Sequence, residues 1–267
     1  MTDISKVTRM KANYHTHTWR CHHAAGAERE YVEDAIAVGI DILGFSDHTP
    51  QFYPDGFTDP YKMKPDQMKG YVDTVLKLKE EYKNQISLHL GLEVEYLPAY
   101  FDELIRFISD FPIEYFILGQ HYLGNEINDV FSADPTDDPD VLDRYVKQCE
   151  EAMDTGRFTY LAHPDLINFT GGETVYVRLM RNLCEHAKSR HIPLEINFLG
   201  IWGKRNYPNQ VFWHIAGEVG NEVIFGADAH QPDKVWNPKA FAFAQWMVDQ
   251  HHLNRIETVR LIDPRDR

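Results

Sequence analysis

Residues 222–230 read EVIFGADAH, a short apolar run that ends in an acidic residue and a histidine. The length of the run and its content of Val, Ile and Phe are typical of a buried strand. Six other runs of this kind precede it: MKANYHTH (10–17), ILGFSDH (42–48), SLHLGLEVEY (87–96), YFILGQHY (115–122), FTYLAHPD (158–165) and PLEINFLG (193–200). The stretches between the runs have the apolar spacing of amphipathic helices, as at Tyr71, Val75, Leu78 and Tyr82. The sequence therefore predicts seven strands that alternate with helices.

Such an alternation indicates an α/β fold with a parallel sheet, and at 267 residues a closed, TIM-like barrel is its natural form. A doubly wound open sheet is the alternative. It normally places a glycine-rich turn after the first strand, and this sequence has none there. Because no repeat, low-complexity tract or linker divides the chain, we expect residues 1–267 to form a single barrel domain.

The chain is acidic: 41 Asp and Glu residues outnumber 27 Lys and Arg, which gives a net charge of −14 with neutral histidine. This argues against nucleic acid or an anionic membrane as the main partner, but not against a small anionic substrate. Three widely spaced cysteines, Cys21, Cys149 and Cys184, suit a reducing compartment. The first residues lack the apolar stretch of a signal peptide, and no run approaches the ~18 apolar residues of a membrane span. We therefore expect a cytoplasmic location.

Six of the seven strand-like runs end in side chains that can bind a metal. The acidic residues and histidines at these ends are His15, His17, Asp47, His48, Glu93, His121, His163, Asp228 and His230, and His22 and His23 follow the first run. The carboxyl ends of parallel barrel strands converge on one face, so these side chains should meet. A lone histidine there is usually a hydrogen-bonded structural residue. Burying the whole set without a bound metal would, however, cost about 1–3 kcal/mol for each group left unpaired. Imidazole suits Zn, Fe, Mn or Cu, and bridging carboxylates suit sites that hold more than one ion.

The runs also resemble a known family. YHTHTWRCHH (14–23), GFSDH (44–48), GLEVE (91–95), LGQH (118–121), LAHPD (161–165) and GADAH (226–230) are similar, in this order, to the motifs of the polymerase and histidinol phosphatase (PHP) superfamily. The resemblance spans residues 10 to about 230 and implies a distorted (β/α)7 barrel with three divalent metal ions. It implies one ion on His15, His17, Glu93 and Asp228, a second on Glu93, His121 and His163, and a third on His23, His48 and His230. His23 is chosen over His22 because it lies six residues after His17, the spacing that the family uses.

Two further residues are candidates for substrate binding. Arg205, in GIWGKRNYP (200–208), resembles the arginine that stand-alone histidinol phosphatases place over the substrate phosphate, although an exposed arginine can also be a plain surface charge. Asp165 could contact a substrate ammonium group or cap the segment that follows it. The histidinol phosphatases of the family carry a second arginine near the end of the fifth strand, and HPDLINFTGG (163–172) has none.

The resemblance implies a metal-dependent phosphomonoesterase that hydrolyses L-histidinol phosphate, a small phosphorylated substrate of histidine biosynthesis. Water activated by the ions would attack the phosphoryl group, Arg205 would hold its oxygens, and Asp228 or His230 would handle the proton. A PHP-type enzyme for another phosphomonoester or a phosphodiester is the first alternative. A non-catalytic accessory module is the second, and it would predict lost ligands or an attached polymerase region, neither of which the sequence shows.

Overall fold

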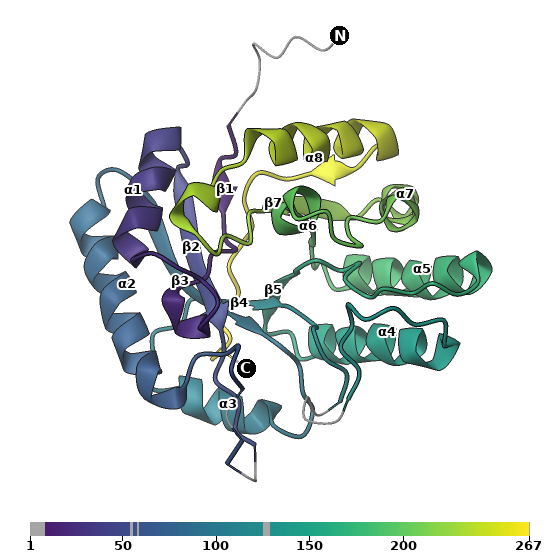
Figure 1. Ribbon diagram of the computed structural model, residues 1–267, viewed down its shortest axis with the longest axis horizontal. Coiled ribbons are helices and arrows are strands. Elements are labelled where there is room, and N and C mark those ends of the chain that lie inside the picture. The colour runs from purple at the N-terminus through teal and green to yellow at the C-terminus, as the bar shows by residue number, and fades with distance from the viewer. Residues whose placement is uncertain (1–8, 54–55, 58, 125–128, 267) are drawn as a thin grey trace.

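All seven predicted strands are present in the computed structural model, which describes residues 9–53, 56–57, 59–124 and 129–266. They pair in parallel and in chain order, and a short eighth strand is added beside the seventh (Figure 1). The strands are β1 Ala12–Asn13, β2 Ile42–His48, β3 Ser87–Val94, β4 Tyr115–Leu118, β5 Phe158–Leu161, β6 Leu194–Asn197, β7 Glu222–Gly226 and β8 Asn254–Arg255. The predicted α/β fold with successive parallel strands is confirmed.

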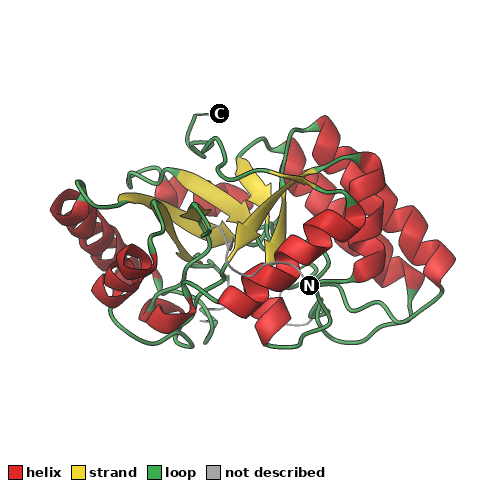
Figure 2. Cartoon of the chain, turned by 90° about the horizontal axis from the view of Figure 1, so that it is seen from above, coloured by secondary structure: helices red, strands yellow, loops and turns green. Residues whose placement is uncertain are grey.

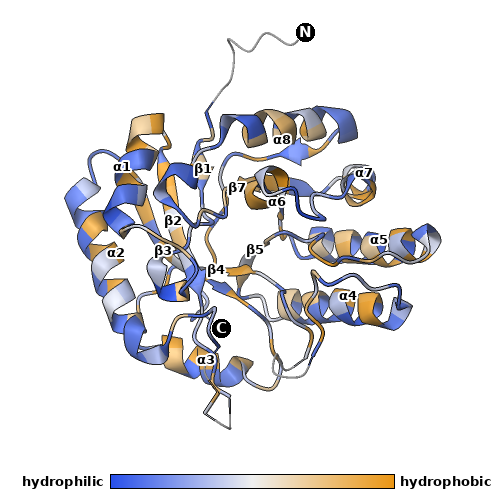
Figure 3. Cartoon of the chain, viewed as in Figure 1, coloured by the Kyte–Doolittle hydropathy of each residue, from blue (hydrophilic) through white to orange (hydrophobic). Residues whose placement is uncertain are grey.

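Helices surround the strands on the outside of the curled sheet (Figures 1 and 2). They are α1 Glu28–Val38, α2 Met68–Tyr82, α3 Phe101–Ile108, α4 Pro139–Asp154, α5 Glu173–Ser189, α6 Phe198–Trp202, α7 Gln210–Val219 and α8 Pro238–His251. Figure 3 shows both hydrophobic and hydrophilic stretches on them, as expected of helices with one buried face. Among the described residues, none of the helices combines the length and the apolar content needed to cross a membrane.

The sheet forms an incomplete barrel. β1 and β7 are not paired along their length, but the chain just beyond them meets in a parallel bridge between Thr16 and Ala229. His17 N donates to Ala229 O at 2.9 Å, and Ala229 N donates to His15 O at 3.2 Å. Because this junction lies past the carboxyl ends of both strands, it brings the two ligand-bearing segments of the first and seventh runs side by side.

A buried apolar cluster that includes Tyr14, Tyr115 and Tyr160 fills the interior of the barrel. The barrel interior holds an apolar cluster in which Tyr115 is fully buried, and its hydroxyl donates to Tyr14 O at 2.8 Å and to Phe45 O at 3.1 Å. Gly91 makes room for this ring, since a Cβ there would lie 2.3 Å from Tyr115 Cε1. Residues of the C-terminal tail, including Val259, pack against the same cluster. This cluster fills the interior of the barrel next to the polar side chains, since the hydroxyl of its member Tyr160 donates to Glu195 Oε1 at 3.4 Å.

The ion-pair cluster of Glu114, which immediately precedes β4, yields a prediction about stability. Glu114 accepts from Leu90 N at 2.7 Å and from Lys79 Nζ at 2.8 Å, and it lies 3.1 Å from His89 Nδ1. Burial would raise its pKa, but the contacts with His89, Lys79 and Leu90 lower it to about 2. Because the folded-state pKa is depressed, the stabilisation is complete above the ordinary pKa of a glutamate and is lost as the pH falls towards 2.

Glu114→Gln should therefore lower the free energy of unfolding by about 1–3 kcal/mol at pH 7, with a difference that shrinks as the pH falls. Urea unfolding of chelator-treated wild type and variant, from pH 7 down to pH 3, measures both values. A difference that stays constant over this range would show that the charge of Glu114 contributes nothing.

Candidate metal centre

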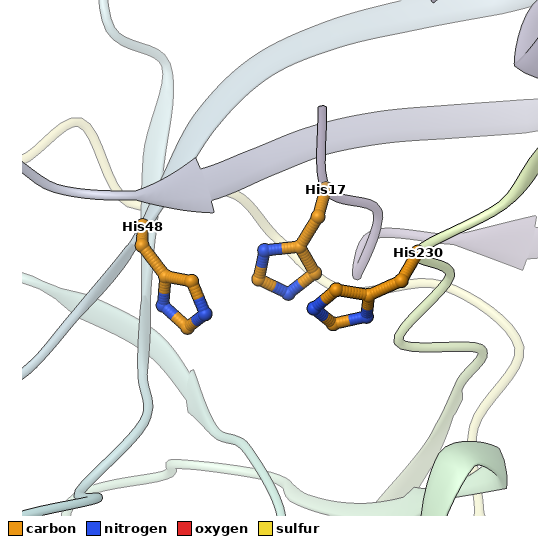
Figure 4. A group of neighbouring side chains, drawn as sticks. All are labelled: His17, His48 and His230. Carbon is orange, nitrogen blue, oxygen red and sulfur yellow. The ribbon is translucent and has the colours of Figure 1, made fainter. Parts of the chain in front are cut away.

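The nine predicted metal ligands converge at the carboxyl ends of the strands. They come from segments at the ends of β1, β2, β3, β4, β5 and β7 and from the loop after β1, and six of them line a cavity of about 550 Å³. Figure 4 shows three of these side chains, His17, His48 and His230, facing the same space from three different segments. The His17 ring lies 4.4 Å from that of His48 and 4.1 Å from that of His230, measured between centroids.

Glu93 lies at the middle of the group and is 2% exposed. Its Oε1 is 2.9 Å from His163 Nε2 and 3.7 Å from His121 Nε2. Its Oε2 is 3.1 Å from His48 Nδ1, 3.4 Å from His17 Nε2 and 3.5 Å from His15 Nε2.

The two oxygens of Glu93 therefore face different sets of imidazoles, as a carboxylate shared between ions would. Burial alone would raise the pKa of this carboxyl, but the imidazoles of His48, His15 and His121 hold it well below its usual range. Gly119 on the next segment leaves space for the side chain, because a Cβ there would lie 2.0 Å from Oε1. Glu93 is thus a charged carboxylate, stabilised by the surrounding imidazoles and accommodated by the glycine at 119.

Several buried nitrogen and oxygen atoms of the candidate ligands lack hydrogen-bond partners, and this tests whether the group fits a metal ion. The buried atoms His15 Nε2, His17 Nε2 and Glu93 Oε2 have no hydrogen-bond partner, although all three point into the cluster. His15, His17 and Asp228 offer donor atoms within 4.8 Å of one another, and so do His15, Glu93 and His163. Unpaired buried polar atoms are rare in proteins, and nitrogen and oxygen donors grouped this closely are what a divalent transition metal requires. The residues present fit metal ions.

A second group surrounds His230. Its Nε2 lies 2.9 Å from His23 Nε2, and the ligand atoms of His17, His48 and His230 lie within 4.8 Å of one another. Burial and the nearby His17 lower the pKa of His230 to about 3, so its ring is neutral and can offer a lone pair. Of the two candidate histidines after the first run, His23 lines the cavity and His22 does not, among the residues that the structure describes.

Two residues beside the ligands were missed by the sequence analysis. Glu195 Oε1 is 2.8 Å from His15 Nδ1, and Glu95 Oε1 is 3.0 Å from His121 Nδ1. Each buried carboxylate therefore faces the ring nitrogen that points away from the cluster. Glu95 stands in the quoted motif GLEVE, two residues after Glu93, and this spacing on a strand could have marked it. Glu195 is a single acid within the apolar run PLEINFLG, a weaker signal of the same kind.

The two predicted substrate-binding residues are placed differently. Arg205 is exposed at the mouth of the cavity and lines it together with Trp202 and Tyr207. Asp165 is buried and is not among the described residues that line the cavity. Its Oδ2 accepts from Asn209 N at 2.5 Å and from Trp213 Nε1 at 3.0 Å.

These contacts give Asp165 a role that neither sequence-based interpretation named, because its carboxyl holds the start of α7, 44 residues along the chain, rather than the segment that directly follows it. Asn209 is the N-cap of α7 and Trp213 lies within that helix. Burial raises the pKa of Asp165 to about 7. Asp165→Asn retains an oxygen that can accept both bonds, so the KM for a phosphorylated amine should change by less than about twofold. A KM that rises tenfold or more in steady-state assays would instead indicate an ionic contact with the substrate.

Comparison with known proteins assigns the family. The sequence profile of the PHP domain matches residues 13–198, which include seven of the nine candidate ligands. The chain belongs to the PHP domain family. The PHP domain match ends before Asp228 and His230, which the structure brings to the same cluster.

Curated relatives of this PHP protein cover most of its length. A probable histidinol-phosphatase of Deinococcus radiodurans is 29% identical in an alignment over 231 residues that covers 83% of this chain and 86% of the relative. The histidinol-phosphatase of Bacillus subtilis is 25% identical in an alignment over 260 residues that covers 84% of this chain and 95% of the relative. A crystal structure of histidinol phosphate phosphatase from Lactococcus lactis, complexed with zinc, L-histidinol and phosphate, matches with a TM-score of 0.72 at 18% identity. It covers 94% of this chain and 99% of that one, so the two proteins share their fold.

Proposed function

We propose that this protein is a metal-dependent phosphatase that hydrolyses L-histidinol phosphate to L-histidinol and phosphate. The observation that carries the proposal is the set of nine candidate ligand side chains, Glu93 and eight others, with Arg205 at the mouth of the same cavity. Its relatives from Deinococcus radiodurans and Bacillus subtilis, each matched over more than four fifths of this chain, are named histidinol-phosphatases. An accessory module that had lost catalysis would not be expected to retain every ligand.

We assign the nine side chains to three divalent ions, for which Zn, Fe and Mn are the candidates. The first ion is held by His15, His17, Glu93 and Asp228, the second by Glu93, His121 and His163, and the third by His23, His48 and His230. When bound, such ions withdraw electron density from phosphoryl oxygens and make water a stronger acid. Glu93 supports two of the sets at once, because its oxygens lie 2.9 Å from His163 Nε2 and 3.4 Å from His17 Nε2.

The remaining residues bind the ester and move its proton. Arg205 can take two phosphoryl oxygens with its planar guanidinium group. His230 faces the cavity and Asp228 Oδ1 lies 3.3 Å from its Nδ1, so these two side chains are placed to relay the proton that the attacking water gives up. The apolar lining, which includes Phe131, Leu166 and Leu199, can contact the imidazole ring of the substrate.

The test is a panel of phosphate esters assayed on one preparation of known metal content. The panel contains L-histidinol phosphate, several other phosphomonoesters of amino alcohols and sugars, and a bis-aryl phosphodiester. We expect the highest kcat/KM for L-histidinol phosphate and no hydrolysis after chelation. Full activity in a metal-free sample would end the proposal, and a higher kcat/KM for another ester would move it to a different substrate.

One observation favours that alternative of a different phosphomonoester. Of the described residues that line the cavity, Arg205 and Lys62 are the two with a permanent positive charge, and Lys62 forms an ion pair with the buried Glu95. The second arginine of the family's histidinol phosphatases thus has no counterpart at the expected place.

The proposal also includes a cytoplasmic location, which three buried and unpaired cysteines support.

A further inference from the structure

Glu195 is a buried carboxylate beneath the candidate ligands, to which the proposed function gives no role. It lies on β6, the strand whose end carries no predicted ligand, and it is fully shielded from solvent. Its Oε1 is 2.8 Å from His15 Nδ1, and its Oε2 accepts from His163 N at 3.1 Å. Asn197 Nδ2 donates both to Glu195 Oε2 at 2.9 Å and to Asp228 Oδ2 at 3.1 Å. Through these bonds one carboxylate is linked to three candidate ligands that follow three different strands.

The bond to His15 decides which of its ring nitrogens is available. A carboxylate only accepts, so in the neutral ring Nδ1 carries the proton and Nε2 keeps its lone pair. This Nε2 is buried without a hydrogen-bond partner and lies 3.5 Å from both Glu93 Oε2 and Asp228 Oδ1. A histidine that binds a metal through Nε2 needs this tautomer, and a carboxylate on Nδ1 also makes the ring a better donor.

The bond to His163 acts on the backbone. His163 has a φ of 29°, a conformation that is unfavourable for a residue with a side chain and persists only where its surroundings hold it. Glu195 Oε2 accepts from the N–H of this residue, while the ring of His163 places Nε2 2.9 Å from Glu93 Oε1. The carboxylate therefore helps to fix the turn that points this ring into the cluster.

The neighbouring strand is adapted to the carboxylate. A Cβ at Gly226 on β7 would lie 1.8 Å from Glu195 Oε1, so this position admits no side chain while residue 195 is a glutamate. An apolar residue at 195 would fill the barrel without the cost of removing a carboxylate from water. A hydrophobic core would need neither the buried charge of Glu195 nor the glycine at 226 that makes room for it. Both are expected where a carboxylate supports the ligands of a metal centre.

We infer that Glu195 is a positioning residue of the metal centre, which sets the tautomer of His15 and the backbone of His163 so that both rings present Nε2 to the ions. The inference rests on the metal centre of the proposed function and not on which ester is cleaved.

The test is the zinc affinity of Glu195→Gln, measured by competition with a chromogenic chelator. The amide keeps the size of the side chain but loses the charge, and its NH₂ group must oppose either the N–H of His15 or that of His163. We expect zinc to bind about 10–100-fold more weakly, with hydrolysis that falls at limiting zinc and returns with excess zinc. Glu114→Gln is the matched control, because Glu114 also contacts a histidine Nδ1, that of His89, but precedes β4 at the opposite end of the barrel. Its zinc affinity should stay that of the wild type.

Zinc affinity equal to that of the wild type in Glu195→Gln, even with a lower Tm, would reduce Glu195 to a structural residue. Should the variant fail to fold, the ¹⁵N spectrum of the histidine rings in zinc-loaded wild type decides: a proton on Nδ1 of His15 supports the inference, and a proton on Nε2 overturns it. Weaker zinc binding in a protein that cleaves no histidinol phosphate would overturn the proposed substrate and leave this inference standing.

Discussion

Glu93→Gln should abolish hydrolysis almost completely and release metal. The side chain contacts imidazoles through both oxygens, with His163 Nε2 at 2.9 Å from one and His48 Nδ1 at 3.1 Å from the other. A neutral amide has one good acceptor atom instead of two, so it bridges two cations poorly. We expect kcat/KM to fall by about 10³-fold or more, together with a loss of at least one metal ion per chain. Steady-state kinetics and elemental analysis of the same sample measure the two effects.

The same change at Glu114 separates this effect from general damage. Glu114→Gln removes a carboxylate that accepts from Lys79 and lies 3.1 Å from His89 Nδ1, near the opposite ends of the strands. It should lower stability but keep the metal content and kcat/KM of the wild type. If Glu93→Gln retains both its metal and its activity, the shared-carboxylate arrangement is wrong.

The fold could be predicted because its strands are short, apolar and regularly separated by amphipathic stretches. What could not be predicted is how little of the first run belongs to the sheet. Of MKANYHTH only residues 12–13 pair with β2, and the chain then leaves the ladder to meet the segment after β7 at Thr16 and Ala229. β8 was missed because its two polar residues, Asn254 and Arg255, pair only through the tertiary contact with β7.

The candidate ligands could be predicted because their residue types stand at matching strand ends, and the structure brings all nine together. Roles that depend on side-chain direction could not. Asp165 stands two residues after His163, as a ligand-side residue would, but its carboxyl turns to Trp213, 48 residues further along the chain. Glu195 faces the site from within an apolar run, and a strand pattern does not reveal which face of a barrel strand points inward.

Arg205→Ala should lower kcat/KM by about 10²–10³-fold without changing the metal content, because a charged donor is lost where charge moves in the transition state. Arg205 lies at the mouth of the cavity, beside Tyr207, and its backbone N–H donates to Gly200 O at 3.0 Å. This bond ties the loop to α6 and so fixes the position of the Arg205 backbone, from which the side chain extends. Arg205→Lys should restore only part of the activity, since an ammonium group cannot contact two phosphoryl oxygens in a plane. Steady-state kinetics with L-histidinol phosphate and elemental analysis check both variants.

Lys204→Ala is the control, because Lys204 is the neighbouring exposed cation and is not among the described residues that line the cavity. The net charge of the loop changes equally in Lys204→Ala and Arg205→Ala, so general electrostatic attraction of a phosphate predicts equal losses. A direct contact predicts a loss in Arg205→Ala alone. Equal kcat/KM values in the two variants would therefore show that Arg205 acts only as a surface charge. The metal ions, which bind every phosphate ester alike, would then be the sole binding site for the phosphoryl group.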